Sequence, residues 1–301
     1  MWKEFKMFWN WFLAIGLFVS LSNILFSQAQ DSIRIRTVPV AGKVWMMDCE
    51  NGFGGGNVAA MAGDEGVLLV DAMYASMTEK IKKAAFTLSN LPIRWVVNSH
   101  FHRDHIEGNK NLRTSAVIIG QENIAKRLRS KHTQTTPTLD MMPSVFFSDS
   151  LTLTVNGEDI RIIHMPGSHT SADVVVYFTQ SNVLHLGDLF FHGMFPAVYT
   201  DGGGNIHQLI ASLDKIEKMF PVDVKIIPGH GPLATMPALH EYIIMLKETV
   251  TAAQEGLRNK QTSDQLLKTS VFQKYNYLGD GGAQTTEQYI NMLFKLLSES
   301  K

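Results

Sequence analysis

A stretch of six residues, His-Phe-His-Arg-Asp-His at 100–105, constrains this chain more than any other feature. Four of its side chains are of metal-ligating types, and it follows an apolar segment, residues 94–99, with the pattern of a buried strand. Residues two apart in an extended segment point to the same side, so His100 and His102 can present two imidazoles to one cation. A solvated polar loop, the ordinary alternative, gives no reason for this spacing.

Asp104 and His105 lie past the turn that ends this strand, at the start of an expected helix through Asn109 and Leu112. They can therefore face a second cation beside the first. Imidazole nitrogen and carboxylate oxygen suit zinc or another first-row divalent ion, whereas magnesium and calcium prefer mostly oxygen ligands. The stretch thus predicts a site for two divalent metal ions, with zinc as the expected metal.

Three later segments each place a candidate ligand within two residues of a glycine, after a short apolar run. His169 would complete three imidazoles on the first ion, and Asp188 is a carboxylate able to bridge both ions. His230 would join Asp104 and His105 on the second ion. A single His or Asp at a strand end is more often structural, so only the four segments taken in order favour a metal site.

That order resembles the metallo-β-lactamase superfamily over about residues 38–245. The resemblance rests on Ser-His-Phe-His-Arg-Asp-His at 99–105, Gly-Val-Leu-Leu-Val-Asp at 66–71, and the three glycine-flanked segments. It implies an α/β fold, a four-layer αββα sandwich of two mixed sheets flanked by helices, with a dinuclear site at one edge between the sheets. It also implies that the metal ligands are His100, His102, Asp104, His105, His169, Asp188 and His230.

Within the superfamily, this ligand set is similar to that of bridging-aspartate hydrolases such as glyoxalase II. Two differences leave the substrate open. β-Lactamases with a cysteine ligand carry it near the position of Asp188, whereas the thiol of this chain, Cys49, lies far upstream. The glyoxalase-like motif commonly continues with paired small residues, whereas Glu107 places an acid there.

Hydrolysis is the expected chemistry. Two divalent ions lower the pKa of water toward about 7, so a hydroxide shared between them would attack an ester, thioester, lactone or amide-type bond. Asp104 is the expected catalytic residue, because it can orient this nucleophile and carry a proton to the leaving group. Two alternatives stay open: an iron-dependent oxidoreductase or dioxygenase on the same fold, and a non-catalytic metal- or ligand-binding protein.

Residues 1–29 have the pattern of a targeting segment. Lys3 and Lys6 precede an apolar stretch at 12–26, and residues 27–29 form a small-x-small cleavage pattern. We therefore expect a signal peptide and an exported protein, periplasmic or secreted. An uncleaved membrane anchor is the alternative, although three polar residues interrupt the apolar stretch.

Residues 30–301 are expected to form one catalytic domain with C-terminal helices from about residue 235. Removing Lys3, Lys6 and Glu4 changes the formal net charge from −1 to −2, which favours neither nucleic acid nor an anionic membrane as a partner. A small-molecule substrate is the expected partner, and the oligomeric state stays open. One cysteine excludes an intramolecular disulfide.

Short β-branched runs alternate with segments of helical periodicity, which indicates an α/β fold. Strands are expected at residues 44–47, 58–61, 67–70, 95–98, 116–119, 151–155, 161–164, 174–178, 183–186 and 225–227. Helices are expected at residues 77–88, 122–129, 208–220, 237–253 and 287–297. Two loops, 48–57 with four glycines and 132–147, are candidates to cover the site.

Several other polar residues have two interpretations. His185 lies in a strand pattern and is expected in the core or behind the ligands. His192 either reaches the cleft or lies in an ordinary loop, and Arg103 either holds a substrate anion or is solvated. Asn205 and Tyr199 are hypothetical oxyanion contacts.

Overall fold

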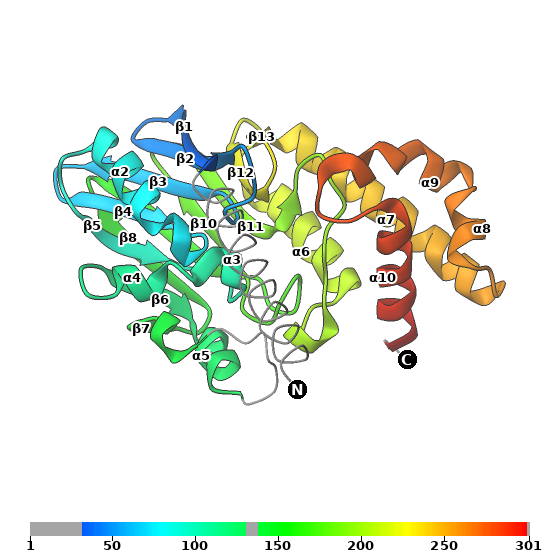
Figure 1. The fold of residues 1–301 in the computed structure, drawn as a ribbon. Coiled ribbons are helices and arrows are strands. Elements are labelled where there is room, and N and C mark those ends of the chain that lie inside the picture. Colours follow the sequence, from blue (N-terminus) through cyan, green and yellow to red (C-terminus); the bar gives the residue numbers. More distant parts are fainter. Residues whose placement is uncertain (1–31, 131–137, 300–301) are drawn as a thin grey trace, which may run out of the picture.

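Two β-sheets lie face to face, with helices on both outer sides, in the computed structural model (Figure 1), which describes residues 32–130 and 138–299. The first sheet has seven strands in sequential order, antiparallel from β1 to β4 and parallel from β4 to β7. Its strands are β1 (Arg34–Ala41), β2 (Val44–Glu50), β3 (Val58–Gly63), β4 (Gly66–Val70), β5 (Ile93–Val97), β6 (Val117–Gln121) and β7 (Val145–Phe147).

The second sheet has six strands in the order β13-β12-β11-β10-β9-β8, and only the β11–β12 pair of this sheet is parallel. Its strands are β8 (Ser150–Val155), β9 (Glu158–His164), β10 (Val174–Phe178), β11 (Val183–Phe191), β12 (Lys225–His230) and β13 (Ala234–Thr235). Both sheets are therefore mixed.

The helices divide between the two halves of the chain. Those of the first half are η1 (Ala75–Met77), α2 (Thr78–Leu88), α3 (Arg103–Ile106), α4 (Asn109–Leu112), α5 (Glu122–Arg129) and η2 (Leu139–Met141). Those of the second half are η3 (Thr200–Gly202), α6 (Ile206–Met219), α7 (Met236–Arg258), α8 (Ser263–Leu267), α9 (Ser270–Tyr275), η4 (Asn276–Gly281) and α10 (Thr286–Glu299).

Strand alternation in β4 shows how the layers are built. Leu68 faces the second sheet, where it belongs to a buried cluster with Ile162 and Val176, whereas Val67 and Leu69 face outward to a cluster that includes residues of α2. Successive side chains of a strand point to opposite faces, so a continuously apolar strand can join two cores at once. This is why the sequence shows an unbroken apolar run there.

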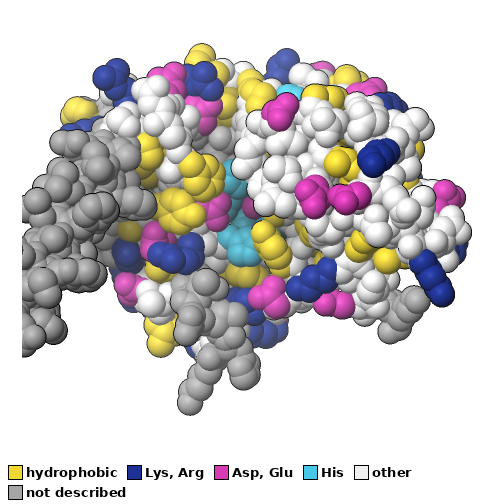
Figure 2. Space-filling model, turned by 45° about the vertical axis from the view of Figure 1, so that its right-hand side comes forward, with side chains coloured by type: hydrophobic (Ala, Val, Ile, Leu, Met, Phe, Trp, Pro, Cys, Tyr) yellow, Lys and Arg dark blue, Asp and Glu magenta, His cyan; other side chains and the backbone are white. Residues whose placement is uncertain are grey.

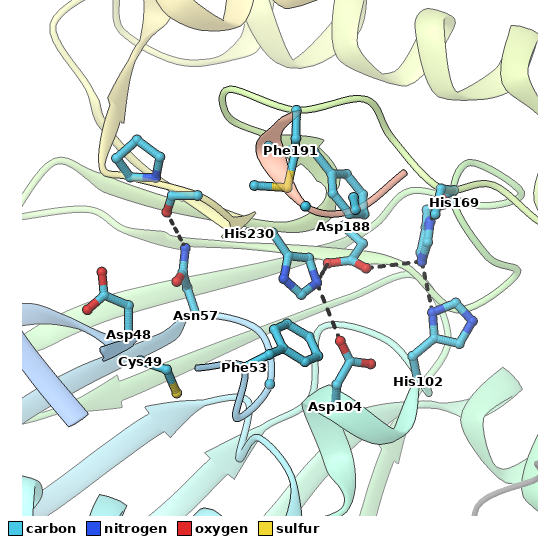
Figure 3. A pocket seen from close by; sticks show the side chains of 18 of the residues that line it. Asp48, Cys49, Phe53, Asn57, His102, Asp104, His169, Asp188, Phe191 and His230 are labelled. Carbon is cyan, nitrogen blue, oxygen red and sulfur yellow. Dashed lines mark hydrogen bonds and ion pairs between the residues drawn. The ribbon is translucent and has the colours of Figure 1, made fainter. Parts of the chain in front are cut away.

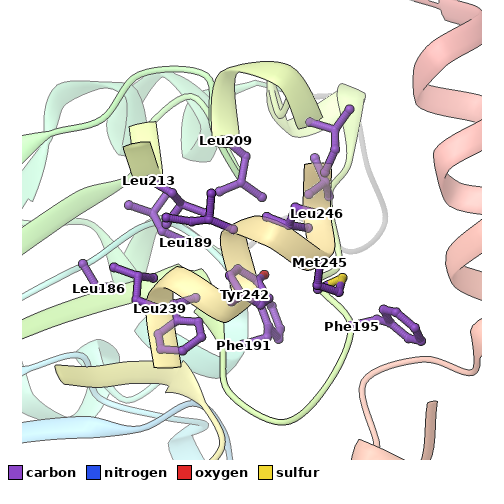
Figure 4. Packing of buried hydrophobic residues seen from close by; sticks show 14 of the residues in the cluster. Leu186, Leu189, Phe191, Phe195, Leu209, Leu213, Leu239, Tyr242, Met245 and Leu246 are labelled. Carbon is purple, nitrogen blue, oxygen red and sulfur yellow. The ribbon is translucent and has the colours of Figure 1, made fainter. Parts of the chain in front are cut away.

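A third buried cluster fills the space between the second sheet and the helices α6, α7 and α10 (Figure 4). Leu186 and Leu189 of β11 pack there with Leu209, Leu213 and Leu246 of the helices. The three clusters correspond to the three interfaces of a four-layer αββα arrangement. The prediction of an α/β sandwich with two mixed sheets is thus confirmed.

Some elements differ from the expectation. Strands β1, β7 and β13 were missed, because β1 carries charged residues on an exposed edge and the other two are only three and two residues long. Helices α8 and α9 were missed for the same reason of length. The expected continuous helix from Asp104 to Leu112 is wrong: it is divided into α3 and α4, where a Cβ on Gly108 would lie 2.2 Å from the carbonyl oxygen of Ala72.

The expected targeting segment, residues 1–29, lies outside the described residues, so its cleavage stays a prediction. Within the described ranges, no helix is long and apolar enough to cross a membrane.

Phe195 provides a test of the contact between α10 and the segment that follows β11. Its ring is fully buried and stacks on Tyr289 of α10 with centroids 4.2 Å apart. We expect Phe195→Ala to lower the free energy of unfolding by about 3–5 kcal/mol, because it leaves a cavity. Val222→Ala, at a side chain that is 77% exposed, should change it by less than about 0.5 kcal/mol. Denaturant titrations followed by circular dichroism would measure both, and equal effects would contradict the packing role.

Candidate metal centre

The structure brings the seven predicted ligands together in two adjacent groups. Figure 3 labels five of them, namely His102, Asp104, His169, Asp188 and His230. Within each group, the ligand atoms all lie within 4.8 Å of one another. The first group consists of His100, His102, His169 and Asp188, and the second consists of Asp104, His105 and His230. The division into two groups is the one that the sequence predicted.

Each sheet supplies part of this site. The segment after β5 of the first sheet carries the ligands at 100–105, and the second sheet and its loops carry His169, Asp188 and His230. The ligands therefore meet only because the two sheets are stacked.

Asp188 lies within β11, which contradicts the expectation that this strand ends at residue 186. The strand continues to Phe191 through an irregularity at Gly187, whose φ of 51° is one that residues with a side chain rarely adopt. Gly229 of the neighbouring strand also requires a glycine, because a Cβ there would lie 2.2 Å from Asp188 Oδ1. The local kink and the close approach direct the Asp188 carboxylate toward the imidazoles.

The two oxygens of Asp188 face different groups of ligands. Oδ1 lies 3.1 Å from Nε2 of His105 and 3.3 Å from Nε2 of His230. Oδ2 lies 3.3 Å from Nε2 of His169 and 3.7 Å from Nε2 of His100. A carboxylate in this position can contribute one oxygen to each of two cations.

Asp71 orients two of the imidazoles from behind. Its Oδ2 accepts hydrogen bonds from Nδ1 of His105 at 2.7 Å and from Oγ of Ser99 at 2.6 Å, and its Oδ1 accepts from the Ser99 backbone N–H at 2.7 Å. Since the Ser99 hydroxyl hydrogen is directed at Asp71, the Nδ1–H of His100 donates to Ser99 Oγ at 3.0 Å. Both rings are therefore held with Nε2 directed into the site.

A separate set of hydrogen bonds fixes His169. Its Nδ1 donates to the carbonyl oxygen of Ala197 at 2.5 Å, which again leaves Nε2 facing the site. The buried carboxylate of Asp173 accepts from the backbone N–H groups of His169 and Thr170, both at 2.7 Å. Asp173 thus holds the turn that carries this ligand.

Burial keeps the three imidazoles of the first ligand group in the neutral form, which binds metals. It lowers the pKa of His100, His102 and His169, to about 3 for His102, so these rings are neutral at pH 7. Neutral imidazole is the metal-binding form, and a neutral ring need not lose a proton when a cation enters.

The remaining ligands form ion pairs with one another. Burial would raise the pKa of Asp188, but the surrounding imidazoles hold it well below its ordinary value. Burial would lower the pKa of His105 and His230, but the charges of Asp188 and Asp104 raise it, to about 9 for His230. A cation entering this half must displace protons from imidazolium groups.

Two buried atoms indicate that a cation fits here. In the described part of the chain, the buried atoms without a geometrically good hydrogen bond include His100 Nε2 and Asp188 Oδ1, the latter having only ion-pair contacts with His105 and His230. Such atoms are rare in native proteins because the loss of their hydration is uncompensated, and a metal ion between the ligand groups would satisfy both. The combination of imidazole nitrogen and carboxylate oxygen suits zinc or another first-row divalent ion.

Five of the ligands line a cavity of about 840 Å³, namely His102, Asp104, His169, Asp188 and His230. Figure 2 shows histidine side chains at the centre of this hollow, with hydrophobic and acidic side chains beside them. The glycine-rich loop 48–57 lines it through Phe53 and Asn57, and the segment that follows β11 lines it through Met194 and Tyr199. The loop thus lies against the site and is not a remote surface turn.

The other polar candidates have ordinary positions. His185 is buried behind the ligands and contacts the carbonyl oxygen of Asn57 through Nε2. His192 lies outside the cavity lining and contacts the carbonyl oxygen of Pro232. The oxyanion hypothesis is wrong for Asn205, because its side chain caps α6.

Three supporting residues were missed from the sequence, namely Asp71, Asp173 and Asn57. The side chain of Asn57 donates to the carbonyl oxygens of Pro228 and Gly231, at 2.9 and 2.8 Å, and so binds the turn that carries His230. Of the three, only Asp71 could have been found from the sequence, because it ends the apolar strand of the motif at 66–71.

Comparisons with known proteins agree with this architecture. A family model described as the metallo-beta-lactamase superfamily matches residues 51–231, more than half of the chain. A hydroxyacylglutathione hydrolase of Prochlorococcus marinus is 31% identical over 143 residues, which cover 47% of this chain and 52% of that protein. A linear primary-alkylsulfatase of a Pseudomonas species is 24% identical over 232 residues, which cover 62% of this chain and 43% of that protein.

The chain thus spans about half the length of the curated relatives it matches. Among solved structures, a metallo-beta-lactamase from Pontibacter korlensis aligns with a TM-score of 0.61 at 20% identity, covering 71% of this chain and 99% of that one. At this level of identity the likeness concerns the fold.

Asp71→Asn tests the support behind His105. Asparagine keeps the shape but cannot accept all three hydrogen bonds, and it removes the charge that fixes the Nδ1–H tautomer. We expect the affinity for a divalent cation to fall about 10–100-fold, measured by competition with a chromogenic chelator. Asp64→Asn, at an exposed position, should leave it unchanged. An unchanged affinity in Asp71→Asn, with the fold intact by circular dichroism, would rule out the supporting role.

Proposed function

This chain belongs to the metallo-beta-lactamase superfamily, and we propose that it is a metal-dependent hydrolase with two divalent cations, zinc being the expected metal. The position of Asp188 carries the proposal. Its two oxygens separate the ligands into a group of three imidazoles and a group with Asp104, His105 and His230. A single structural ion would use only one of these two groups of ligands.

Bound divalent cations would lower the pKa of water toward about 7 and stabilise negative charge that develops on the substrate oxygen. The protein's own residues supply the geometry. The imidazoles held by Asp71 and Ala197 keep their Nε2 atoms fixed, so little reorganisation accompanies the reaction.

Asp104 is the proposed proton carrier. Its side chain is 18% exposed and lines the cavity, and its Oδ2 lies 3.4 Å from Nε2 of His230 and 3.6 Å from Nε2 of His105. A carboxylate that faces both the ligands and the substrate space can accept a proton from water and donate it to a leaving group.

The expected bond is an ester, thioester, lactone or amide-type bond. Relatives named hydroxyacylglutathione hydrolase and linear primary-alkylsulfatase support hydrolysis as the reaction class. We further propose that residues 1–29 direct export, which fractionation of cells producing the full chain would test.

Metal removal tests the proposal directly. Dialysis against a chelator should abolish hydrolysis of a panel of esters, thioesters and lactones, and zinc should restore it with two ions bound per chain by elemental analysis. Restoration by iron alone, together with oxygen consumption, would instead favour the redox alternative. Hydrolysis that survives complete metal removal would contradict the proposal.

Asp104→Asn tests the proton carrier. We expect kcat to fall by about 100-fold or more with the fold intact, because asparagine cannot accept the proton. Asp264→Asn, at an exposed position in α8, is the matched control and should keep full activity. Near-normal turnover by Asp104→Asn would exclude the assignment.

A further inference from the structure

We propose that the cavity selects substrates whose group beside the metal site is uncharged and apolar, an inference that rests on the proposed hydrolase function. Two observations carry it. Apolar side chains reach as far as the ligand His230, and both arginines of the cavity lining are already paired with buried carboxylates.

The apolar surface begins at the ligands themselves. The His230 ring lies between two phenylalanine rings, with centroids 5.7 Å from Phe53 and 5.1 Å from Phe191 and interplanar angles of 30° and 22°. Phe53 is 59% exposed and lines the cavity, so it offers a large apolar surface beside the site. A substrate group that passes between the ligands and the cavity mouth must contact this surface.

A second apolar wall comes from the C-terminal region. Gly281, Gly282 and Ala283 line the cavity together with Met194 and Ala197. A Cβ on Gly281 would lie 2.5 Å from both the Gly193 carbonyl oxygen and Met194 Cβ, so the two segments pack closely. The wall is built of small apolar residues and backbone, which favours a compact apolar group.

The arginines of the lining, Arg36 and Arg103, are not free to bind an anion. Arg103 Nη2 lies 2.5 Å from Glu107 Oε1, and Arg36 donates to Asp48 at 2.9 and 2.5 Å. Each guanidinium is about half exposed, but the Glu107 and Asp48 side chains are only 10% and 11% exposed.

The burial of Glu107 and Asp48 makes their arginines difficult for a substrate anion to recruit. Ion pairs between exposed groups exchange partners at little cost. Removing the arginine from a mostly buried carboxylate is different, because it takes away the closest counterion. Glu107 would keep only the longer contact with Lys110, at 3.8 Å. A substrate anion would therefore have to compete with Glu107 for Arg103, and with Asp48 for Arg36. Among the described residues that line the cavity, no other lysine or arginine is present.

The cations of the site do not change this conclusion. Their charge would act on the reacting group itself, and it is partly balanced by Asp104 and Asp188. Selection of a substituent takes place farther out, between Phe53 and the wall at 281–283. There the lining offers apolar surface and paired charges.

Two matched acyl groups test the inference with the metal-loaded protein. 4-Nitrophenyl butyrate and 4-nitrophenyl hemisuccinate have the same chain length but differ by one carboxylate. The hemisuccinate also releases nitrophenolate spontaneously, by attack of its own carboxylate, so the rate without protein is subtracted for each ester. We expect the remaining kcat/KM to be at least tenfold higher for the butyrate ester. An equal or higher value for the hemisuccinate would overturn the inference.

Glu107→Gln tests the role of the paired arginine. This variant keeps the side-chain shape but frees Arg103, so the preference for butyrate over hemisuccinate should shrink several-fold. Glu79→Gln breaks an exposed pair with Lys82 on α2, away from the cavity, and should leave the preference unchanged. An unchanged preference in Glu107→Gln, with metal content intact, would contradict the proposed role of the pair.

Ala283→Phe tests the C-terminal wall. A phenyl group at this exposed position should narrow the cavity and reduce kcat/KM for 4-nitrophenyl butyrate more than for the acetate ester. Tyr277→Ala, at a 65% exposed side chain in the same region but outside the lining, is the control. Equal effects on both esters would place the acyl group elsewhere.

A binding measurement separates the inference from the proposed function. Calorimetric titration of the metal-loaded protein with butyrohydroxamic acid and succinic monohydroxamic acid requires no turnover. Tighter binding of the uncharged ligand without hydrolysis of any ester would keep the inference and contradict the hydrolase. Hydrolysis combined with tighter binding of the succinyl ligand would do the reverse.

Discussion

Apolar contact between the two sheets is the interaction on which the rest of this structure depends. Residues such as Leu68 of the first sheet and Val176 of the second are fully buried in it. Neither sheet alone contains a complete group of ligands, since His100 and His102 follow β5 whereas Asp188 lies on β11. Hydrophobic burial, which is not directional, places the sheets together. Hydrogen bonds from Asp71, Asp173 and Asn57 then set the directions.

A metal site requires ionisable ligands, whereas the buried surroundings of these ligands disfavour charge. Seven ionisable side chains lie at one edge of a largely apolar sandwich, where an isolated charge is costly. The protein reduces this cost by keeping three imidazoles neutral and by placing charged partners around Asp188. Two buried atoms remain unsatisfied even so. Local conflict of this kind concentrates at functional sites, because a sequence selected for stability alone would replace such groups.

Four of the ligands could be predicted from local spacing, because residues 100–105 contain four side chains of metal-ligating types. His169, Asp188 and His230 were accessible because glycine flanks each of them after an apolar run. The supporting residues could not be predicted in this way. Asn57 contacts Pro228 and Gly231, and no local sequence pattern indicates contacts between residues so far apart in the chain. The same reason hid the cavity wall at 281–283. Asn205 shows the converse error, since a polar residue near the site serves only as a helix cap.

The side chain of Asn57 bridges the two halves at the ligand edge, joining the start of β3 to the turn around His230. An ion captured between halves that are already joined would be bound by the folded chain and not by the unfolded one. Each such ion would add stability by mass action, about 2.7 kcal/mol when its free concentration is a hundred times its dissociation constant. The resistance of this fold to heat and proteolysis would then follow the metal supply of its surroundings, and starvation for the ion would weaken the whole sandwich.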